Sequence, residues 1–180
     1  MRFFRVFEVQ NMFKVGDNII YGVGGVMTVV DLRSERITGE EKTYYLLCDY
    51  GKRSASVTYV PADNEKLVSS MHHLLSREEV LVTISRVKEL PDLEWIQDNR
   101  QRAEAYRSVL RSMDRLSILL MIRTIHNTGL RRAAMGKKNF LADEGVMQKA
   151  ERILGEEFSI VLGISEDEAR AMLEKELWGE

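Results

Sequence analysis

A glycine-rich reversal near the start of the chain constrains the fold more than any other feature. Gly22, Gly24 and Gly25 lie between the apolar stretches Ile19–Tyr21 and Val26–Val30. Glycine adopts positive φ without steric cost, and a tight reversal between two strands often needs this conformation. The β-branched and aromatic residues on both sides favour strands. The stretch therefore predicts a β-hairpin and places a small antiparallel β domain at the start of the fold.

The strand-like pattern continues to about residue 60. Turns are expected at Ile37–Glu41 and Tyr50–Arg53, between apolar stretches. Val60-Pro61 is expected to end the pattern, because proline has no N–H to donate to a neighbouring strand. This spacing suits a five-stranded antiparallel β barrel. Its strands are expected at Phe13–Val15, Asn18–Tyr21, Val26–Leu32, Thr43–Asp49 and Ser56–Val60.

The pattern changes to helical spacing after residue 75. Ser76 and Glu79 form a capping-box pattern, and Ser165 and Glu168 repeat it. Apolar residues then recur every three or four positions, and Gly136–Leu141 predicts a basic loop. Helices are therefore expected from Ser76 to Leu90, Asp98 to Arg111, Asp114 to Gly129, Asp143 to Leu162 and Ser165 to Trp178.

These patterns predict an α+β chain of two domains. Residues 12–70 are expected to form the β barrel and residues 71–180 an all-α helical domain, with residues 1–11 as an extension of unknown role. The content of 44% apolar and 30% charged residues is typical of a soluble globular protein. The apolar runs are far shorter than the ~20 residues of a membrane span. We expect a cytoplasmic monomer that uses no cofactor.

Charge is distributed unevenly, although the net charge is only −2. Residues 92–154 hold twelve Lys and Arg against eight Asp and Glu, whereas residues 155–180 hold two bases and eight acids. Residues 115–142 contain six bases and no acid, a pattern typical of phosphate binding. Arg115 and Arg123 are interpreted as solvated helix surface. The candidate phosphate ligands flank the expected basic loop and are Arg131, Arg132, Lys137 and Lys138.

No set of residues indicates catalysis. His72 and His73 are adjacent, so their side chains point in different directions and do not readily share a metal. The single cysteine, Cys48, excludes an internal disulfide and a cysteine zinc site. Gly22–Gly25 lies between strands, whereas a phosphate-binding loop leads from a strand into a helix. Since no nucleophile, base and orienting residue form a set, we expect that the protein is not an enzyme.

Short motifs in both halves of the chain follow one another in an order that is typical of a known family. The first half contains Phe13-Lys14-Val15-Gly16-Asp17, then Tyr21, Gly39-Glu40-x-Lys42-x-Tyr44 and Val60-Pro61. The second half contains Trp95, Ser112-x-Asp114, Gly136-Lys137-Lys138 and Lys149-Ala150-Glu151. In this order the motifs resemble the CarD/CdnL family of bacterial transcription regulators, from about Met12 to Leu162. Gly22 stands where the family pattern has proline, and Met113 where it has glycine.

The resemblance implies a non-catalytic regulator of transcription initiation. In this family a Tudor-like barrel binds the β subunit of RNA polymerase, and a helical domain contacts promoter DNA at the upstream edge of the transcription bubble. A tryptophan wedges into the minor groove there and favours the open complex. Carried onto this sequence, the polymerase-binding residues are Glu35, Arg36, Ile37, Val57, Thr58, Tyr59 and Val60.

The same resemblance makes Trp95 the expected wedge. Asn99, Arg100 and Arg102 follow within about two helical turns and are the expected contacts to the groove edge and flanking phosphates. With Arg131, Arg132, Lys137 and Lys138 they complete the expected DNA-binding set.

Several alternatives stay open at the level of the sequence. Trp95 can instead pack the helical domain onto the barrel, because large aromatic residues are usually mostly buried. Tyr59 can pack or form a hydrogen bond within its own domain. A protein-interaction adaptor without specific DNA contact competes with the regulator as a function. A small-molecule-binding barrel is a weaker third alternative, since five strands enclose little space.

Overall fold

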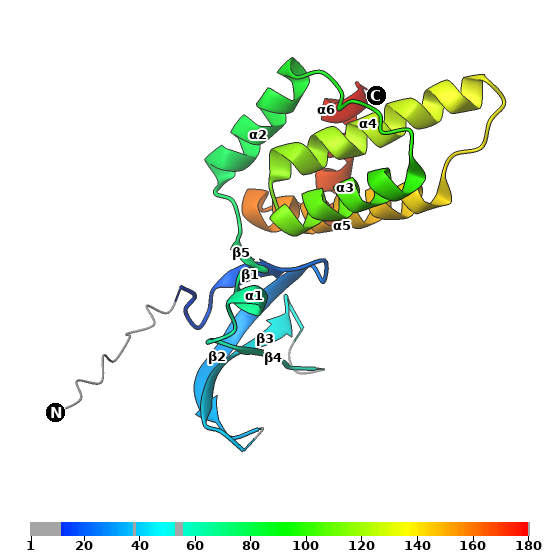
Figure 1. Ribbon diagram of the computed structural model, residues 1–180. Helices are drawn as coiled ribbons and strands as arrows, with labels where there is room; N and C mark the ends of the chain where they lie inside the picture. The colour runs from blue at the N-terminus through cyan, green and yellow to red at the C-terminus, as the bar shows by residue number, and fades with distance from the viewer. Residues whose placement is uncertain (1–11, 38, 53–55, 180) are drawn as a thin grey trace.

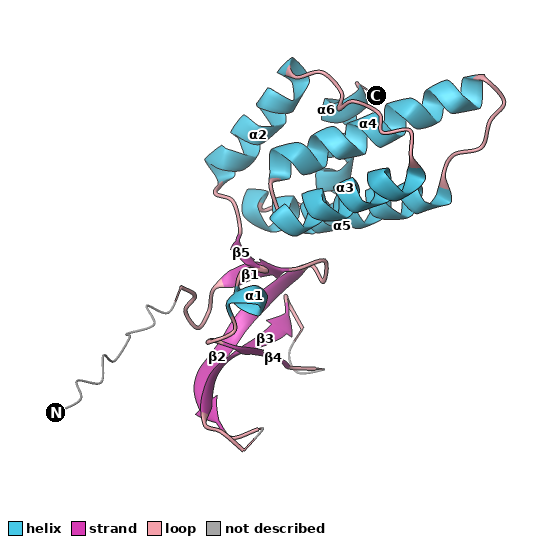
Figure 2. Ribbon diagram, in the orientation of Figure 1, coloured by secondary structure: helices cyan, strands magenta, loops and turns pink. Residues whose placement is uncertain are grey.

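The computed structural model describes residues 12–37, 39–52 and 56–179. It has an α+β fold in which the strands come first and the long helices follow (Figure 1, Figure 2). The strands are β1 (Asn18–Tyr21), β2 (Val26–Glu35), β3 (Lys42–Asp49), β4 (Thr58–Pro61) and β5 (Met71–His73). The helices are α1 (Glu65–Val68), α2 (Arg77–Glu89), α3 (Asn99–Ser112), α4 (Arg115–Ala134), α5 (Leu141–Leu162) and α6 (Glu166–Trp178).

All five strands form one antiparallel sheet with the order β4-β3-β2-β1-β5. Within the described residues β4 and β5 each pair with a single neighbour, so the sheet is open and the expected closure into a barrel is not observed. The strand predicted at Ser56–Val60 is found at Thr58–Pro61. β2 has an irregular register between Val29 and Asp31, which bends this long strand (Figure 1).

The prediction that Phe13–Val15 forms the first strand is wrong, and β5 takes the fifth place in the sheet. A turn forms in this segment, where the N–H of Lys14 donates to the Asp17 carboxylate over 2.8 Å. Phe13 is only 1% exposed, and its ring packs edge-on against Tyr45 in the sheet core. Because β5 pairs with β1, the sheet extends past residue 70, the expected end of the first domain.

The predicted helix starts depend on local sequence, and the structure confirms those at Ser76, Asp98, Asp114 and Ser165, whereas α5 begins at Leu141 and not at Asp143. Complete capping boxes form at Ser76 and Ser165, and the Asp98 carboxylate accepts from two N–H groups in the first turn of α3. α4 runs past its expected end at Gly129. Here a Cβ would lie only 3.0 Å from the amide of Asn139, so the missing side chain lets the following loop pack against the helix.

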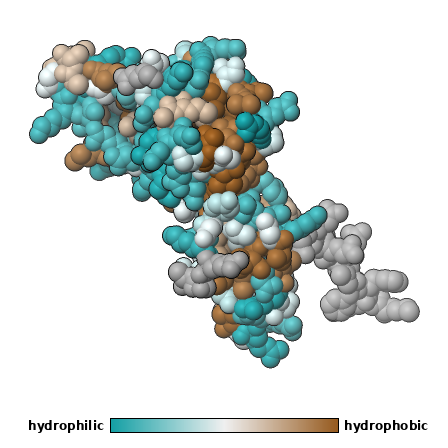
Figure 3. All heavy atoms as spheres, turned by 180° about the vertical axis from the view of Figure 1, so that it is seen from behind, coloured by the Kyte–Doolittle hydropathy of each residue, from teal (hydrophilic) through white to brown (hydrophobic). Residues whose placement is uncertain are grey.

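Apolar side chains form two cores that meet at β1 and β2. Ile19 points into the sheet core and Ile20 into the helical core, as the alternation of side chains along a strand requires. Val26, at the start of β2, also belongs to the helical core. Seen from behind, apolar side chains reach the surface both over the sheet and over the helical part (Figure 3). The first two strands therefore serve both cores.

α5 binds the turn between β1 and β2 through two charged side chains. Arg152 Nη2 donates to the carbonyl of Val23 over 2.9 Å, and the Glu156 carboxylate accepts from the N–H of Val26 over 3.0 Å. Burial raises the pKa of Glu156, although the hydrogen bond from Val26 acts against this. Gly25 has φ +105°, and a Cβ there would lie 2.5 Å from Glu156 Oε2. The turn therefore needs glycine here for both conformation and space.

A buried ion pair fixes the path from β5 to α2. The side chains of Arg115 in α4 and Glu157 in α5 are 8% and 0% exposed, and Nη2 and Oε1 are 2.9 Å apart. Arg115 also donates to the carbonyls of His73 and Met113, while Glu157 accepts from the N–H of Leu75. The interpretation of Arg115 as solvated surface is therefore corrected. Its charge is compensated inside the protein, and it ties the linker after β5 to two helices.

We expect Gly25→Ala to lower the free energy of unfolding by about 2–3 kcal/mol, because the added methyl group meets the Glu156 carboxylate and disfavours the positive φ. Urea denaturation followed by circular dichroism measures this change. Gly16→Ala is the matched control: its φ is +95°, and nothing lies within 4 Å of the added Cβ. The control therefore reports backbone strain alone, and equal losses in the two variants would contradict the role of the Glu156 contact.

Arg115→Leu should lower the free energy of unfolding by about 3–5 kcal/mol, because it leaves Glu157 charged and buried without its partner. The same urea titration measures the loss. Arg111→Leu is the control, since Arg111 and Glu104 are 2.8 Å apart but 62% and 59% exposed. Solvent screens that pair, so the free energy of unfolding of this variant should remain close to that of the parent protein. If Arg115→Leu kept the stability of the parent protein, the buried ion pair would not be what holds the linker between β5 and α2.

Candidate nucleic-acid interface

Trp95 lies in an extended loop between α2 and α3, and a buried arginine holds the start of this loop. Arg123 of α4 donates to the carbonyls of Val87 and Leu90, over 2.5 and 2.6 Å, where α2 ends. These carbonyls have no partner within their own helix, so an arginine fork is a suitable cap. The interpretation of Arg123 as solvated helix surface is corrected, because it is only 9% exposed.

Asp92 anchors the first part of the loop to α4. Its carboxylate accepts from Arg123 Nε over 2.7 Å and from Asn127 Nδ2 over 2.9 Å, and the N–H of Leu93 donates to the Thr124 hydroxyl. Burial opposes ionisation of Asp92, but the hydrogen bonds from Asn127 and Arg123 hold its pKa below the ordinary value. The stabilisation that Asp92 provides is therefore present above its unfolded pKa and is lost as the pH falls through the lowered value.

Arg102 of α3 holds the second part of the loop. It is 1% exposed and donates to the Ile96 carbonyl over 2.7 Å, to Asn99 Oδ1 over 2.9 Å and to the Asp143 carboxylate over 3.0 Å. A second contact to Asp143 and one to the Gln97 carbonyl complete the set. The expectation that Arg102 contacts DNA is corrected by this burial. Its guanidinium is occupied inside the protein, where it positions the loop.

Trp95 stacks on this buried arginine. The Cζ atom of Arg102 lies 4.4 Å from the centre of the Trp95 ring and 4.6 Å from that of Phe140. The two aromatic rings are 6.2 Å apart and inclined by 24°. These partners all belong to the helical part of the chain, and they leave Trp95 half-buried. Trp95 is therefore held in one place by its neighbours while part of its surface remains accessible.

The end of α4 and the loop that leads into α5, here called the α4–α5 hairpin, carry the predicted phosphate-binding residues. Arg131, Lys137 and Lys138 are exposed, whereas Arg132 is half-buried. Arg132 donates twice to the carbonyl of Lys138, over 3.0 and 2.7 Å, and its guanidinium lies 4.0 Å from the ring centre of Phe140. Arg132 therefore shapes the loop, and the three exposed bases remain accessible to phosphates.

Asn99 and Arg100 begin α3 directly after the Trp95 loop, and both are exposed. Asn99 accepts from Arg102, which connects it to Trp95, and Phe140 connects Trp95 to the basic hairpin. The structure thus gathers the predicted DNA-binding residues at one place, with Arg102 and Arg132 in supporting roles.

The predicted polymerase-binding residues Val57 and Tyr59 lie along the open edge of the sheet. Their side chains are 42% and 38% exposed, whereas Val60 is fully buried and its side chain is not accessible to a partner. Tyr59 packs edge-on against Tyr44, and its hydroxyl accepts from Arg33 over 3.1 Å. Tyr59 therefore makes contacts within the sheet and still presents surface.

The register of β4 determines which backbone groups face outward. The N–H of Ala62 donates to the carbonyl of Thr43, so the antiparallel alternation turns the backbone groups of Val60 and Thr58 toward β3 and those of Tyr59 outward. The second predicted group lies close to β4. Arg33 donates to the Tyr59 hydroxyl over 3.1 Å and pairs with the Glu35 carboxylate over 2.6 Å. The sheet therefore connects Tyr59 to Glu35 at the end of β2, and Arg36 and Ile37 follow directly.

Sequence analysis missed two members of the Trp95 site, Asp143 and Phe140. Asp143 follows Arg102 by 41 residues and meets it only because α5 packs on α3. No local pattern marks such a pair. Phe140 did give a sequence signal, because it is the one aromatic residue in the predicted basic loop.

The described residues contain no arrangement suited to a metal centre, since no group of three or more His, Cys, Asp or Glu side chains converges there. Cys48 is a free, buried thiol. Within the same part of the chain, no helix has the length and apolar character needed to cross a membrane.

Arg102→Lys should lower the free energy of unfolding by about 3 kcal/mol, because lysine has neither the planar stacking surface nor the fork of five donors. It should also free the Trp95 ring, which acrylamide quenching of fluorescence reports in a Trp178→Phe background. Arg100→Lys, at an exposed position two residues earlier, is the control and should change neither quantity. Unchanged quenching in Arg102→Lys would mean that the arginine does not position the indole.

No protein-family model matches this chain, and a search of curated proteins finds no match. The resemblance to the CarD/CdnL family therefore rests on the sequence motifs.

Proposed function

We propose that this protein is a non-catalytic regulator of transcription initiation that bridges RNA polymerase and promoter DNA. The sheet would act as a Tudor-like domain that binds the polymerase β subunit, and the helical part as a DNA-binding domain. The contact with DNA is at the upstream edge of the transcription bubble, and it stabilises the open complex. In this proposal the protein acts in the bacterial cytoplasm, on the nucleoid, and as a monomer.

The observation that carries the proposal is the construction of the Trp95 site. Two buried arginines, Arg102 and Arg123, hold the backbone on both sides of a half-buried tryptophan. Three exposed bases lie on the α4–α5 hairpin, which also carries Phe140, the ring that stacks on that tryptophan. A rigidly held aromatic wedge beside cationic side chains is suited to a base step flanked by phosphates.

The open edge of the sheet supports the second half of the proposal. β4 presents the backbone groups and the exposed side chain of Tyr59, and the exposed side chain of Val57 lies directly before it. An added strand would gain main-chain hydrogen bonds there, and alternate side chains would supply specificity. We assign the polymerase contact to this edge together with Glu35, Arg36 and Ile37 at the end of β2, because Arg33 bonds both Tyr59 and Glu35.

The two contacts together explain how weak DNA binding can affect initiation. Docking on polymerase raises the effective concentration of the Trp95 site at the promoter. Since the wedge binds an opened step better than an intact one, it shifts the equilibrium toward the open complex. No bond is formed or broken by the protein.

Exposed apolar side chains at the tip of the hairpin favour a second candidate function. Leu141 is 84% exposed, Met135 69% and Leu130 56%. Such a surface suits a protein partner, so a protein-interaction adaptor without specific DNA contact is the alternative. The test below separates the two functions.

Trp95→Ala should shorten the lifetime of the open complex of a polymerase from a related bacterium by about 10-fold, a loss of ~1.4 kcal/mol. The lifetime is measured by competitor challenge on a promoter fragment. Trp95→Ala should still co-elute with the isolated β subunit, because the sheet is untouched. Trp178→Phe is the aromatic control and should match the parent in both assays. An adaptor would show no effect of Trp95→Ala on the lifetime.

A further inference from the structure

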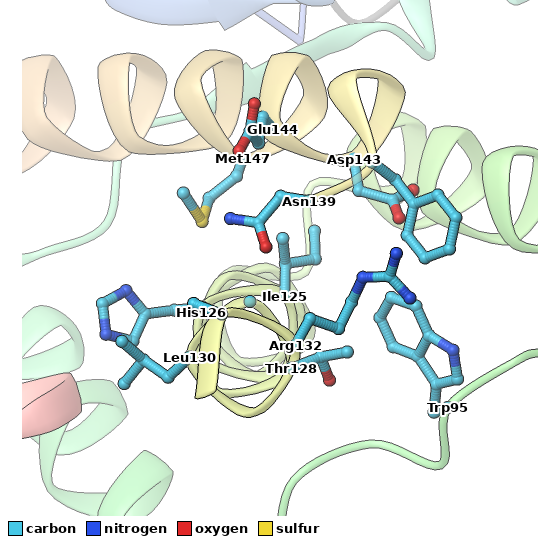
Figure 4. A pocket seen from close by; sticks show the side chains of 13 residues that line it. Trp95, Ile125, His126, Thr128, Leu130, Arg132, Asn139, Asp143, Glu144 and Met147 are labelled. Atoms are coloured by element: carbon cyan, nitrogen blue, oxygen red, sulfur yellow. The ribbon is translucent and has the colours of Figure 1, made fainter. Parts of the chain in front are cut away.

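A pocket of about 210 Å³ opens beside Trp95, between the end of α4, the start of α5 and the loop that joins them (Figure 4). Trp95 and Phe140 form one end of it, and Ile125, Leu130 and Met147 contribute apolar surface. Pockets for drug-sized ligands usually have about 300–1,000 Å³. This one therefore fits a group of one or two fused rings better than a cofactor.

Asn139 provides a polar group inside this apolar pocket. Its amide lies between the two helices, against Gly129 (Figure 4). Within the described residues its side chain makes no hydrogen bond, and Asn139 is exposed, so its donor and its acceptor are both available to a ligand. An amide of this kind can bond a nucleobase edge with one donor and one acceptor. The nearby Glu144 carboxylate also lines the pocket and can accept from an exocyclic amino group.

The charge around the pocket favours a ligand attached to phosphates. Arg131, Lys137 and Lys138 are exposed on the hairpin next to the opening. Of the two acids that line the pocket, Asp143 is paired with Arg102 and Glu144 remains. The bases therefore outnumber the uncompensated acid, and a nucleotide strand is electrostatically favoured there.

We propose that this pocket receives one unpaired nucleobase, stacked on the Arg132 guanidinium that covers the Phe140 ring and bonded by the amide of Asn139. The inference rests on the proposed function and names the part of the promoter DNA that the Trp95 site would bind. When Trp95 enters a base step, the displaced base needs a place to go, and the pocket begins at the indole itself. Extruded bases are held in this way, by stacking and by hydrogen bonds to the base edge.

The test compares two forked DNA duplexes that differ by a single group. The first unpaired position carries a base in one and an abasic site in the other. Fluorescence anisotropy at low salt gives the affinity of the full chain for each. We expect the base-containing fork to bind about 10-fold more tightly, a stacking contribution of ordinary size.

Two variants and one control assign the preference to the pocket. Asn139→Ala should reduce the ratio between the two forks to about 3-fold or less, while binding to the abasic fork stays unchanged. Gln148→Ala removes an exposed amide from α5 outside the pocket lining and should keep the parent ratio. Phe140→Leu should also lower the ratio, because it removes the ring that supports the Arg132 guanidinium.

The inference is overturned if the parent protein binds both forks equally, if it binds neither, or if Asn139→Ala keeps the parent ratio. These results leave the open-complex assay independent. A shortened lifetime in Trp95→Ala together with equal binding of the two forks would reject the base pocket alone. A base preference without any effect on the open complex would instead reject the proposed function and keep the pocket as a site for unpaired DNA.

Discussion

Arginine side chains that are buried and bonded to backbone carbonyls are the constraint on which the rest of the structure depends. Arg115, Arg123 and Arg102 lie in the helical part, and each donates to at least one carbonyl in a loop or at a helix end. Each also pairs with a carboxylate, which is Glu157, Asp92 or Asp143. A guanidinium has five donors in a rigid fork and remains charged at all relevant pH values. Irregular segments thereby acquire fixed positions without forming helices or strands.

The distribution of these arginines explains why the Trp95 loop and the linker after β5 are ordered. Both segments contain carbonyls that have no hydrogen-bond partner in a helix or sheet, and a buried carbonyl without a partner is costly. An ion pair between exposed residues, such as Arg111 and Glu104, does not supply this order, because water competes for it. The strength of the arrangement comes from burial, and burial comes from the packing of α3, α4 and α5.

The sequence predicts features that depend on neighbouring residues better than features that depend on residues far apart in the chain. The capping boxes at Ser76 and Ser165 and the helix start at Asp98 involve residues within three positions, and the sequence predicts them correctly. The fifth strand was misplaced, because the pairing of β5 with β1 joins residues about 50 positions apart and no local signal selects Met71–His73 over Phe13–Val15. Arg102 was assigned to DNA for the same reason. A basic residue near a tryptophan looks the same in the sequence whether its carboxylate partner is absent or lies in another helix.

At Met113 the sequence differs from the CarD/CdnL pattern that it resembles, and the structure accounts for the difference. It is the residue after α3 and has φ 50°, in the left-handed region where glycine is usual. Its side chain is 3% exposed and belongs to the helical core. The burial of a large apolar side chain offsets the backbone strain of about 1–2 kcal/mol. The position therefore tolerates methionine because it lies against a core, whereas an exposed helix end would not.

The sharing of β1 and β2 between two cores limits how the chain can be divided. A fragment that ends at residue 70 lacks β5, and it leaves Ile20 and Val26 without the helices that cover them. The N–H of Val26 also loses the Glu156 carboxylate. A helical fragment from residue 71 keeps Glu156 and Arg152 but loses the turn that they bind. The sheet and the helices are thus best regarded as one folding unit, in which the open edge at β4 and the Trp95 site are held at a fixed separation.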